Sequence, residues 1–202
     1  EQLLLARQEI QDTYINQLNI NELTKNIELN VPNLKGHVNY DEEGVIYIKS
    51  PQMTYKTQSL KELIKQLPDA CRIILIGHRK SLLRKTANDL GLKMYIDILE
   101  DNDREHSLLK SEPRLAITWH SLYKTATSQL TEDFQIPTYD IVIFDESDQV
   151  FMDFYTADKN MTSAQKSLTD RLLETLVWHS TLTVCLDADI SEKFHKNFDR
   201  IE

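Results

Sequence analysis

The chain contains few of the residues that define several large classes of protein. Only two of its 202 residues are cysteine, Cys71 and Cys185, and neither belongs to a CxxC pair. This predicts a reduced chain without a disulfide framework or a zinc knuckle. The six histidines never lie three to five residues apart, so the sequence gives no local support for a histidine metal site.

Glycine, proline and long apolar runs are also scarce. Four glycines and five prolines exclude a collagen-like repeat, and a hydrophobic content of 41% excludes a disordered chain. The longest apolar runs, which include residues 73–76 and 141–144, have strand length, whereas a membrane span needs about 18 residues. We therefore expect no membrane partner.

The beginning of the chain has no basic segment of the kind that opens a signal peptide. We therefore expect an intracellular protein. The first residue is Glu1 rather than Met, which suggests a piece of a longer protein. Net charge is −9, from 23 basic and 32 acidic residues. An acidic balance argues against a surface that coats nucleic acid everywhere, but it permits a local basic groove.

Hydrophobic spacing divides the chain in two. Apolar residues recur at roughly helical spacing over residues 1–30, and Pro32 lies in the segment that breaks this pattern. We expect a helical N-terminal extension in residues 1–40. Short apolar runs then alternate with helical stretches, which predicts one α/β domain over residues 41–202.

The expected elements of this domain form a parallel sheet with helices on both faces, because strands that are apolar throughout are buried on both sides. Function in such sheets lies at the carboxyl ends of the strands. The spacing predicts strands over residues 44–49, 72–76, 93–99, 114–118, 140–144 and 182–186, helices over residues 58–67, 81–90, 121–129, 163–179 and 191–198, and a polar connection over residues 101–112.

Two adjacent acids follow one of these strands. Asp145 and Glu146 come directly after the apolar run 141–144. One carboxylate in such a pair can hold Mg²⁺ while the other orients an attacking water. Alternatively, both are ordinary solvated or helix-capping acids.

A lysine and a hydroxyl follow the first strand. Lys56 and Thr57 lie at the turn into the next helix, where a P-loop keeps its phosphate-binding lysine and its metal-binding hydroxyl. The two consensus glycines are replaced by Ser50 and Tyr55, so the loop is a degenerate version of that motif. Alternatively, Lys56 is a solvated lysine in a turn.

Taken together, these segments resemble the first RecA-like domain of superfamily 2 helicases, in particular the origin-binding-protein type of herpesviruses, other large DNA viruses and plasmids. The resemblance implies a RecA-like P-loop NTPase fold, with a second RecA-like domain in the parent chain that completes the nucleotide cleft. It is carried by five segments in the family's order: residues 50–60, 74–82, 115–122, 139–148 and 184–189.

The resemblance also implies ATP and Mg²⁺ as cofactors. Lys56 would contact the β- and γ-phosphates, Thr57 and Asp145 would hold Mg²⁺, and Glu146 would polarise the hydrolytic water. Asp187 and Asp189 would couple the nucleotide state to the partner domain, although Asp189 is equally a helix cap. The nucleotide-binding loop would comprise Ser50, Pro51, Gln52, Met53, Thr54, Tyr55, Lys56 and Thr57.

DNA contacts are expected at two neighbouring strand ends. His78, Arg79 and Ser121 would contact the phosphates of a single strand or an origin, which fixes position without reading sequence. The alternative is a basic loop and a helix cap. Trp119 is expected to be half-buried packing rather than a platform for stacked bases.

We therefore expect the motor half of an ATP-dependent DNA helicase or translocase acting in replication initiation, in the cytoplasm or, if viral, in the host-cell nucleus or replication site. Two alternatives remain. Tyr55 favours a RecA-like pseudo-ATPase that binds DNA or a protein without nucleotide, whereas the Asp145–Glu146 pair disfavours it. The third hypothesis is a nuclease or phosphatase with a metal cluster formed by Asp145, Glu146, Asp148, Asp187 and Asp189.

Overall fold

The computed structural model describes residues 44–49, 56–101, 106–126, 137–155 and 161–188. The chain divides into two compact units, residues 1–31 and residues 32–202, and every described residue belongs to the second. The expected N-terminal helix and the expected helix over residues 191–198 lie outside the described residues, so both stay predictions.

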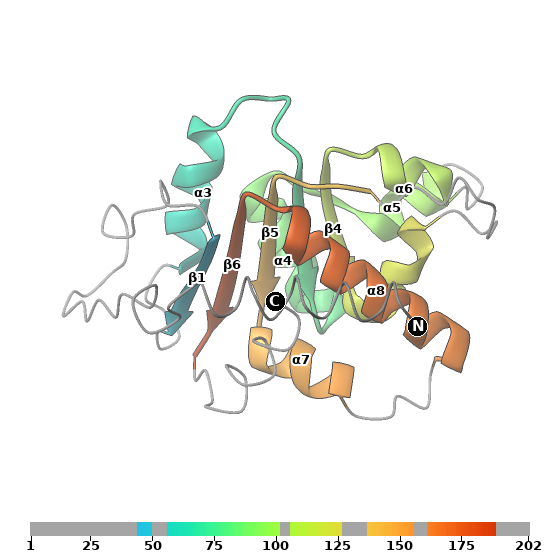
Figure 1. Cartoon of the computed structure of the whole chain (residues 1–202). Coiled ribbons are helices and arrows are strands. Elements are labelled where there is room, and N and C mark those ends of the chain that lie inside the picture. The colour runs from blue at the N-terminus through green and yellow to red at the C-terminus, as the bar shows by residue number, and fades with distance from the viewer. Residues whose placement is uncertain (1–43, 50–55, 102–105, 127–136, 156–160, 189–202) are drawn as a thin grey trace, which may run out of the picture. The chain divides into compact units, whose positions relative to one another are not determined.

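Six parallel strands form a single sheet in this unit (Figure 1). Their order across the sheet is β1-β6-β5-β2-β4-β3, and every neighbouring pair is parallel. The prediction of a parallel sheet is therefore confirmed. The strands are β1 (Gly44–Lys49), β2 (Ile73–Gly77), β3 (Lys93–Met94), β4 (Arg114–Thr118), β5 (Ile141–Asp145) and β6 (Leu182–Asp187).

The most apolar strands occupy the middle of this sheet. All five residues of β2 are buried, as are the first four of β5, whereas β1 at one margin is largely half-buried or exposed. Central strands are covered by helices on both faces and by strands on both sides, which explains their uniformly apolar sequences. Both cysteines are thiols: Cys71 is half-buried just before β2, and Cys185 is buried within β6.

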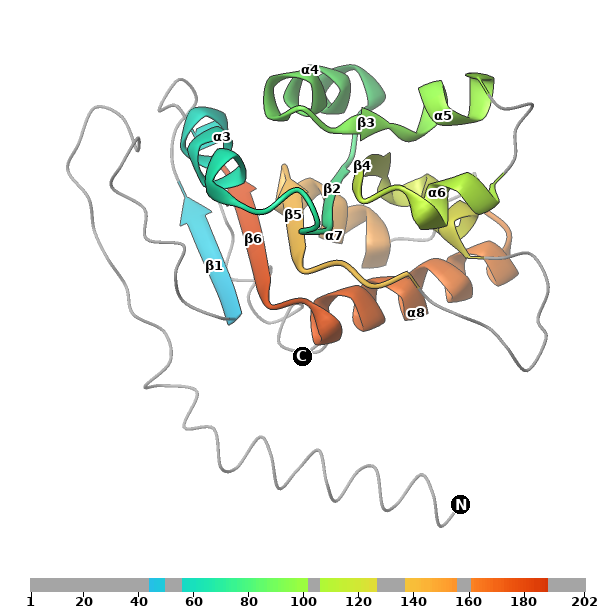
Figure 2. The same ribbon diagram turned by 90° about the horizontal axis from the view of Figure 1, so that it is seen from above.

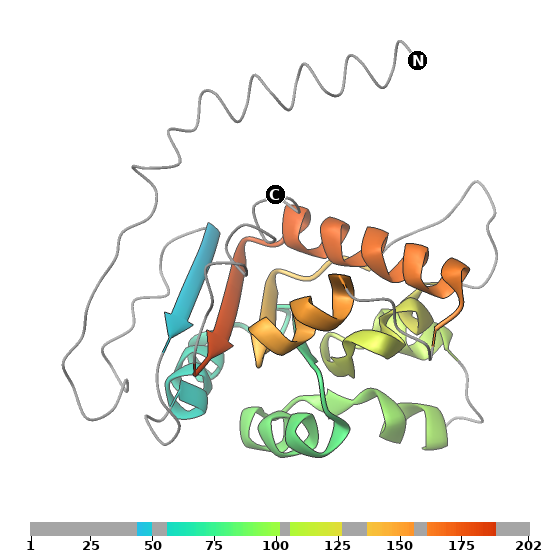
Figure 3. The ribbon, with the colours of Figure 1, turned by 90° about the horizontal axis from the view of Figure 1, so that it is seen from below.

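Helices cover both faces of the sheet, as predicted. Figure 2 shows α3 (Lys56–Gln66) and α4 (Lys80–Leu90) on one face and α8 (Ser163–His179) on the other. A shorter helix, α7 (Ser147–Tyr155), contacts β2, β5 and β6 and lies at their carboxyl ends (Figure 3). Within the described ranges, no helix combines the length and the hydrophobicity of a membrane span.

Two helix boundaries follow directly from local sequence. At the start of α8, Thr162 and Gln165 form a capping box, in which each side chain accepts a hydrogen bond from the other residue's backbone N–H. At the end of α4, Gly91 adopts a left-handed conformation with φ of 71°, and its N–H bonds to the last carbonyls of the helix.

The strand expected over residues 93–99 is mostly wrong. Only Lys93–Met94 is strand, and the chain then forms α5 (Tyr95–Asp101). Within the described residues β3 is the last strand of the sheet and pairs with β4 alone. The spacing of Tyr95 and Leu99 is also helical, and both side chains are buried.

Two further expectations need correction. The expected polar connection over residues 101–112 contains α6 (Ser107–Ser111), which buries Leu109. The described part of the helix expected over residues 121–129 is a 3₁₀ helix, η1 (Trp119–Thr125), and the Thr125 hydroxyl donates to the Leu122 carbonyl in its last turn. Residues 127–129 lie outside the described residues.

Candidate functional site

The carboxyl edge of the sheet brings together residues that the sequence places far apart. In the strand register, Gly77 at the end of β2 lies opposite Asp145 on one side and Thr118 on the other. Asp187 at the end of β6 lies opposite Lys49 of β1. The carboxyl ends of these five strands therefore share one edge, and the predicted site residues that the structure describes lie at or after them.

Lys56 begins α3 and turns back toward this edge. Its half-buried ammonium donates a hydrogen bond of 3.1 Å to the backbone carbonyl of Asp187. Burial lowers the pKa of Lys56, and the carboxylates of Asp187 and Asp145 oppose that change. The predicted phosphate-binding lysine thus lies among the predicted metal and coupling acids.

Asp145 ends β5 and is held by two donors. Its Oδ2 accepts a hydrogen bond of 2.8 Å from the Thr86 hydroxyl, and the carboxylate also accepts one from the backbone N–H of Glu146. Burial raises the pKa of Asp145, while the Thr86 hydrogen bond and the charge of Lys56 lower it. The carboxylate is thus oriented by protein groups on two elements.

Glu146 has an unusual backbone. Its φ is 55°, a left-handed conformation that costs a non-glycine residue of order 1 kcal/mol and is found disproportionately at functional sites. Burial and the neighbouring Asp145 raise the pKa of Glu146, whereas the charges of Arg79 and His78 lower it. A raised pKa suits a carboxylate that exchanges a proton with water.

Asp187 connects β6 to α7. Its Oδ2 accepts the backbone N–H of Asp148 at 2.8 Å, and its Oδ1 accepts the N–H of Ala188 at 2.7 Å. The carboxylate therefore binds the first turn of α7, where a negative charge is favourable. Ser147, in the same turn, is fully buried, and its hydroxyl makes no hydrogen bond within the described part of the chain.

The predicted nucleic-acid residues lie on two adjacent loops. Arg79 is exposed at the start of α4, and the ring of His78 lies 6.1 Å from that of His120 on the neighbouring loop. Ser121 is only 8% exposed, and its hydroxyl donates to the Tyr95 hydroxyl at 3.1 Å. Of the three predicted contacts, Arg79 is therefore the one most open to a ligand.

Trp119 is more deeply buried than expected. Its side chain is 0% exposed rather than half-buried, because it packs under the strand end and against the ring of His120 at 4.0 Å. Its indole N–H makes no hydrogen bond within the described residues. The prediction that Trp119 packs within the protein is confirmed, but its side chain is buried more completely than predicted.

Seven predicted site residues lie outside the described ranges, so their roles stay predictions: Ser50, Pro51, Gln52, Met53, Thr54, Tyr55 and Asp189. Thr57 is described as the second residue of α3, where it is half-buried.

Two residues at this edge escaped the sequence analysis. Thr86, which holds Asp145, lies on the buried face of α4 with Leu83, Ala87 and Leu90. A lone hydroxyl on an apolar helix stripe needs a polar partner, and that signal was available in the sequence. Gly77, at the end of β2, belongs to the predicted motif over residues 74–82, but its close contact with Leu83 was not predicted.

The described residues contain no group of three or more histidine, cysteine, aspartate or glutamate side chains that could hold a metal ion. A cluster of acids alone, as the nuclease or phosphatase hypothesis requires, is therefore not found in that part of the chain.

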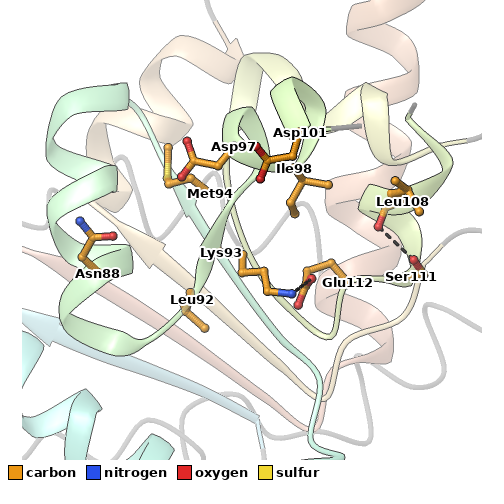
Figure 4. A pocket seen from close by; sticks show the side chains of 10 residues that line it. All are labelled: Asn88, Leu92, Lys93, Met94, Asp97, Ile98, Asp101, Leu108, Ser111 and Glu112. Carbon is orange, nitrogen blue, oxygen red and sulfur yellow. Dashed lines mark hydrogen bonds and ion pairs between the residues drawn. The ribbon is translucent and has the colours of Figure 1, made fainter. Parts of the chain in front are cut away.

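A separate cavity of about 530 Å³ lies far along the sheet from Lys56, beside β3, α5 and α6 (Figure 4). Its charged lining residues are partly paired within the protein. Lys93 forms an ion pair with Glu112 at 2.8 Å, and Asp97 forms two hydrogen bonds with Arg84. None of the predicted site residues lines it, so the candidate site remains the carboxyl edge.

Comparison with known proteins gives a likeness of structure but not of sequence. No family model and no curated protein matches the sequence. A hypothetical ATP-dependent RNA helicase from Sulfolobus tokodaii is 14% identical, with a TM-score of 0.51 over 79% of this chain and 45% of that one. S. cerevisiae Dbp5 bound to RNA and ADP BeF3 is 13% identical, with a TM-score of 0.50 over 81% of this chain and 40% of that one.

The chain spans less than half the length of these two structures. At such low identity the likeness concerns the fold alone. It agrees with the six-stranded all-parallel sheet and with the helices on both of its faces. The described part of this chain therefore has a RecA-like fold, similar to that of domains in these two structures.

Proposed function

We propose that this chain is the first motor domain of an ATP-dependent DNA helicase or translocase that acts in replication initiation inside the cell. The proposal rests on one observation: Lys56, Asp145 and Glu146 lie close together at one edge of a RecA-like sheet.

The residues present fit a magnesium nucleotide. Lys56 supplies a cation for phosphate oxygens, Thr57 a hydroxyl, and Asp145 a carboxylate, which are the groups that P-loop proteins use for this ligand. Bound Mg²⁺ would neutralise phosphate charge.

Each residue has a definite task in this proposal. The Lys56 ammonium exchanges its bond with the Asp187 carbonyl for one with phosphate. Asp145 would be a ligand of Mg²⁺, and Glu146 would accept a proton from the attacking water. Asp187 transmits a change at Lys56 to α7, because it contacts both.

A second RecA-like domain would supply the remainder of the cleft. The RNA helicases with similar structures are more than twice as long as the part that this chain matches. We therefore expect the chain alone to bind ATP but to hydrolyse it slowly. Single-stranded or origin DNA would bind at the loops of Arg79 and His78, beside Glu146.

A pseudo-ATPase that binds DNA or a protein without nucleotide is the second candidate. The helicase family that this chain resembles has glycine at position 55 and usually at position 53, where this chain has Tyr55 and Met53. Glycine there lets a phosphate approach the backbone. In addition, the Lys56 ammonium already has an internal acceptor in Asp187. Both observations favour a loop that has ceased to bind phosphate.

Titration with a fluorescent ATP analogue and Mg²⁺ separates the two candidates. We expect the unaltered chain to bind in the micromolar range and Lys56→Ala to weaken binding roughly 10- to 100-fold, the loss expected for a charged hydrogen bond. Lys65→Ala, on the exposed last turn of the same helix, is the matched control and should change nothing.

Two further titrations complete this test, one on a double variant and one with nucleic acid present. If the chain binds no nucleotide but the double variant Met53→Gly, Tyr55→Gly does, the pseudo-ATPase is correct. The titration is also repeated with single-stranded DNA and with RNA of the same sequence. A motor that acts on DNA should bind nucleotide more tightly with DNA than with RNA, because linked ligands strengthen each other.

A further inference from the structure

We infer that Thr86 is a positioning residue for Asp145, fixing the carboxylate in the orientation that receives the magnesium nucleotide. The inference rests on the proposed function, since it concerns the same site. It adds a residue from α4, an element that contributes none of the predicted nucleotide ligands.

The contact itself is short and shielded. The Thr86 hydroxyl donates to Asp145 Oδ2 at 2.8 Å, and Thr86 is only 9% exposed. A hydrogen bond from a hydroxyl to a carboxylate is stronger than a neutral one, and exclusion of water strengthens it further. Together with the Glu146 N–H, the hydroxyl defines how the carboxylate is turned.

Close packing of α4 makes this contact possible. A Cβ added to Gly77 would lie 2.9 Å from Leu83 Cδ1, closer than side-chain carbons pack. Gly77 is also the register partner of Asp145. Leu83 therefore packs directly against the end of β2, and Thr86, one turn beyond Leu83 on the same helix, reaches Asp145.

The same helix begins at the predicted nucleic-acid loop. Arg79 lies at its N-terminal boundary, directly before Lys80, and both are exposed. A small movement of α4 on binding nucleic acid would move the Thr86 hydroxyl as well. α4 is thus a direct physical connection between the two predicted ligand sites.

The experiment measures the affinity of the 202-residue chain for a fluorescent ATP analogue with Mg²⁺ and with EDTA. We expect Thr86→Val, which keeps the shape but removes the donor, to weaken the Mg²⁺-dependent part of the affinity about tenfold, as outer-shell partners of metal ligands typically do. Affinity in EDTA should be unchanged. Thr86→Ser, which retains the hydroxyl, should restore the Mg²⁺-dependent affinity.

Thr125→Val is the matched control, because it removes another buried threonine hydroxyl whose hydrogen bond, 2.8 Å to the Leu122 carbonyl, lies away from the site. It should bind like the unaltered chain. Circular dichroism checks the folding of every variant, and Thr86→Ala replaces Thr86→Val if the valine does not fold.

The possible failures are distinct. If Asp145→Asn abolishes the Mg²⁺-dependent affinity while Thr86→Val and Thr86→Ala retain it, the positioning role is wrong and the proposed function stands. If the unaltered chain shows no affinity that depends on Lys56, the proposed function is wrong, and the role of Thr86 is overturned with it.

Discussion

The two edges of the sheet differ in how completely their polar groups are satisfied. At the amino edge, Arg72 donates to the Thr138 carbonyl at 2.8 Å and to the Lys110 carbonyl at 2.9 Å. Its guanidinium also lies 4.8 Å from the ring centre of Tyr139, and its backbone N–H donates to Asp140. These contacts tie together the segments that enter β2 and β5 with the end of α6.

Tyr139 completes this amino-edge arrangement. Its hydroxyl donates to the Glu112 carbonyl at 3.2 Å, and burial raises its pKa to about 12. The phenol therefore stays neutral and remains a donor at any ordinary pH.

The carboxyl edge of the sheet differs, because several of its polar groups are desolvated or strained. It holds a desolvated lysine, two carboxyls whose pKa values burial raises, and a left-handed Glu146. It also holds a buried Ser147 hydroxyl that makes no hydrogen bond to any residue the structure describes. The comparison teaches that one sheet can separate its tasks: the amino edge stabilises the fold, and the carboxyl edge keeps strained and desolvated groups available for a ligand.

The largest expected effect is at the amino edge. Arg72→Ala removes two side-chain hydrogen bonds and a cation–π contact, which should lower the free energy of unfolding by about 2 kcal/mol. Urea denaturation measures it. Arg114→Ala is the control, since its contacts with Pro68 and Asp69 are long at 3.4 and 3.9 Å, and it should cost less than about 0.5 kcal/mol. Equal losses in the two variants would contradict the comparison.

A smaller effect, of opposite sign, is expected at the carboxyl edge. Burial raises the pKa of Asp145 above its ordinary 3.8, so the folded state binds the proton more tightly than the unfolded state. Stability contributed by this group is therefore present at low pH and is lost as the pH rises through the folded-state pKa.

Asp145→Asn removes the pH dependence of stability that this carboxyl contributes. The variant should gain stability relative to the unaltered chain as the pH rises from 4 to 7, and urea midpoints across this range measure the difference. Stability curves that stay parallel over the whole range would show that the carboxyl carries no such desolvation cost.

The smallest expected effect on stability concerns the left-handed backbone conformation of Glu146. Glu146→Gly should raise the free energy of unfolding by about 0.5–1 kcal/mol relative to Glu146→Ala, because glycine adopts a φ of 55° without steric cost whereas alanine does not. Thermal unfolding of the two variants is the measurement. Identical stabilities would mean that no strain resides at this position.

Much of the fold could be predicted because its information is local. The runs 73–76 and 141–144 are apolar at every position, which in an α/β chain indicates a strand buried on both faces. α8 was expected at its observed bounds, since its N-terminal cap and apolar spacing agree. The helix that begins at Tyr95 could not be predicted in this way, because its start depends on where β3 ends in the folded sheet.

The candidate site could be predicted in part for the same reason. Lys56, Asp145 and Glu146 follow strands directly, so their common edge follows from a parallel sheet. The hydrogen bond from Thr86 and the left-handed backbone of Glu146 depend on how α4 and α7 pack, and no local pattern gives those distances.

The two thiols of the chain make local opening measurable without any added label. Cys71 is half-buried just before β2, whereas Cys185 is fully buried in β6, opposite Tyr47 and Phe144. Because strand side chains point to the faces of the sheet, a thiol reagent reaches Cys185 only when the packing over β6 opens, two residues before Asp187. The rate at which Cys185 is modified thus reports how often the edge that carries the site opens, and whether nucleotide closes it.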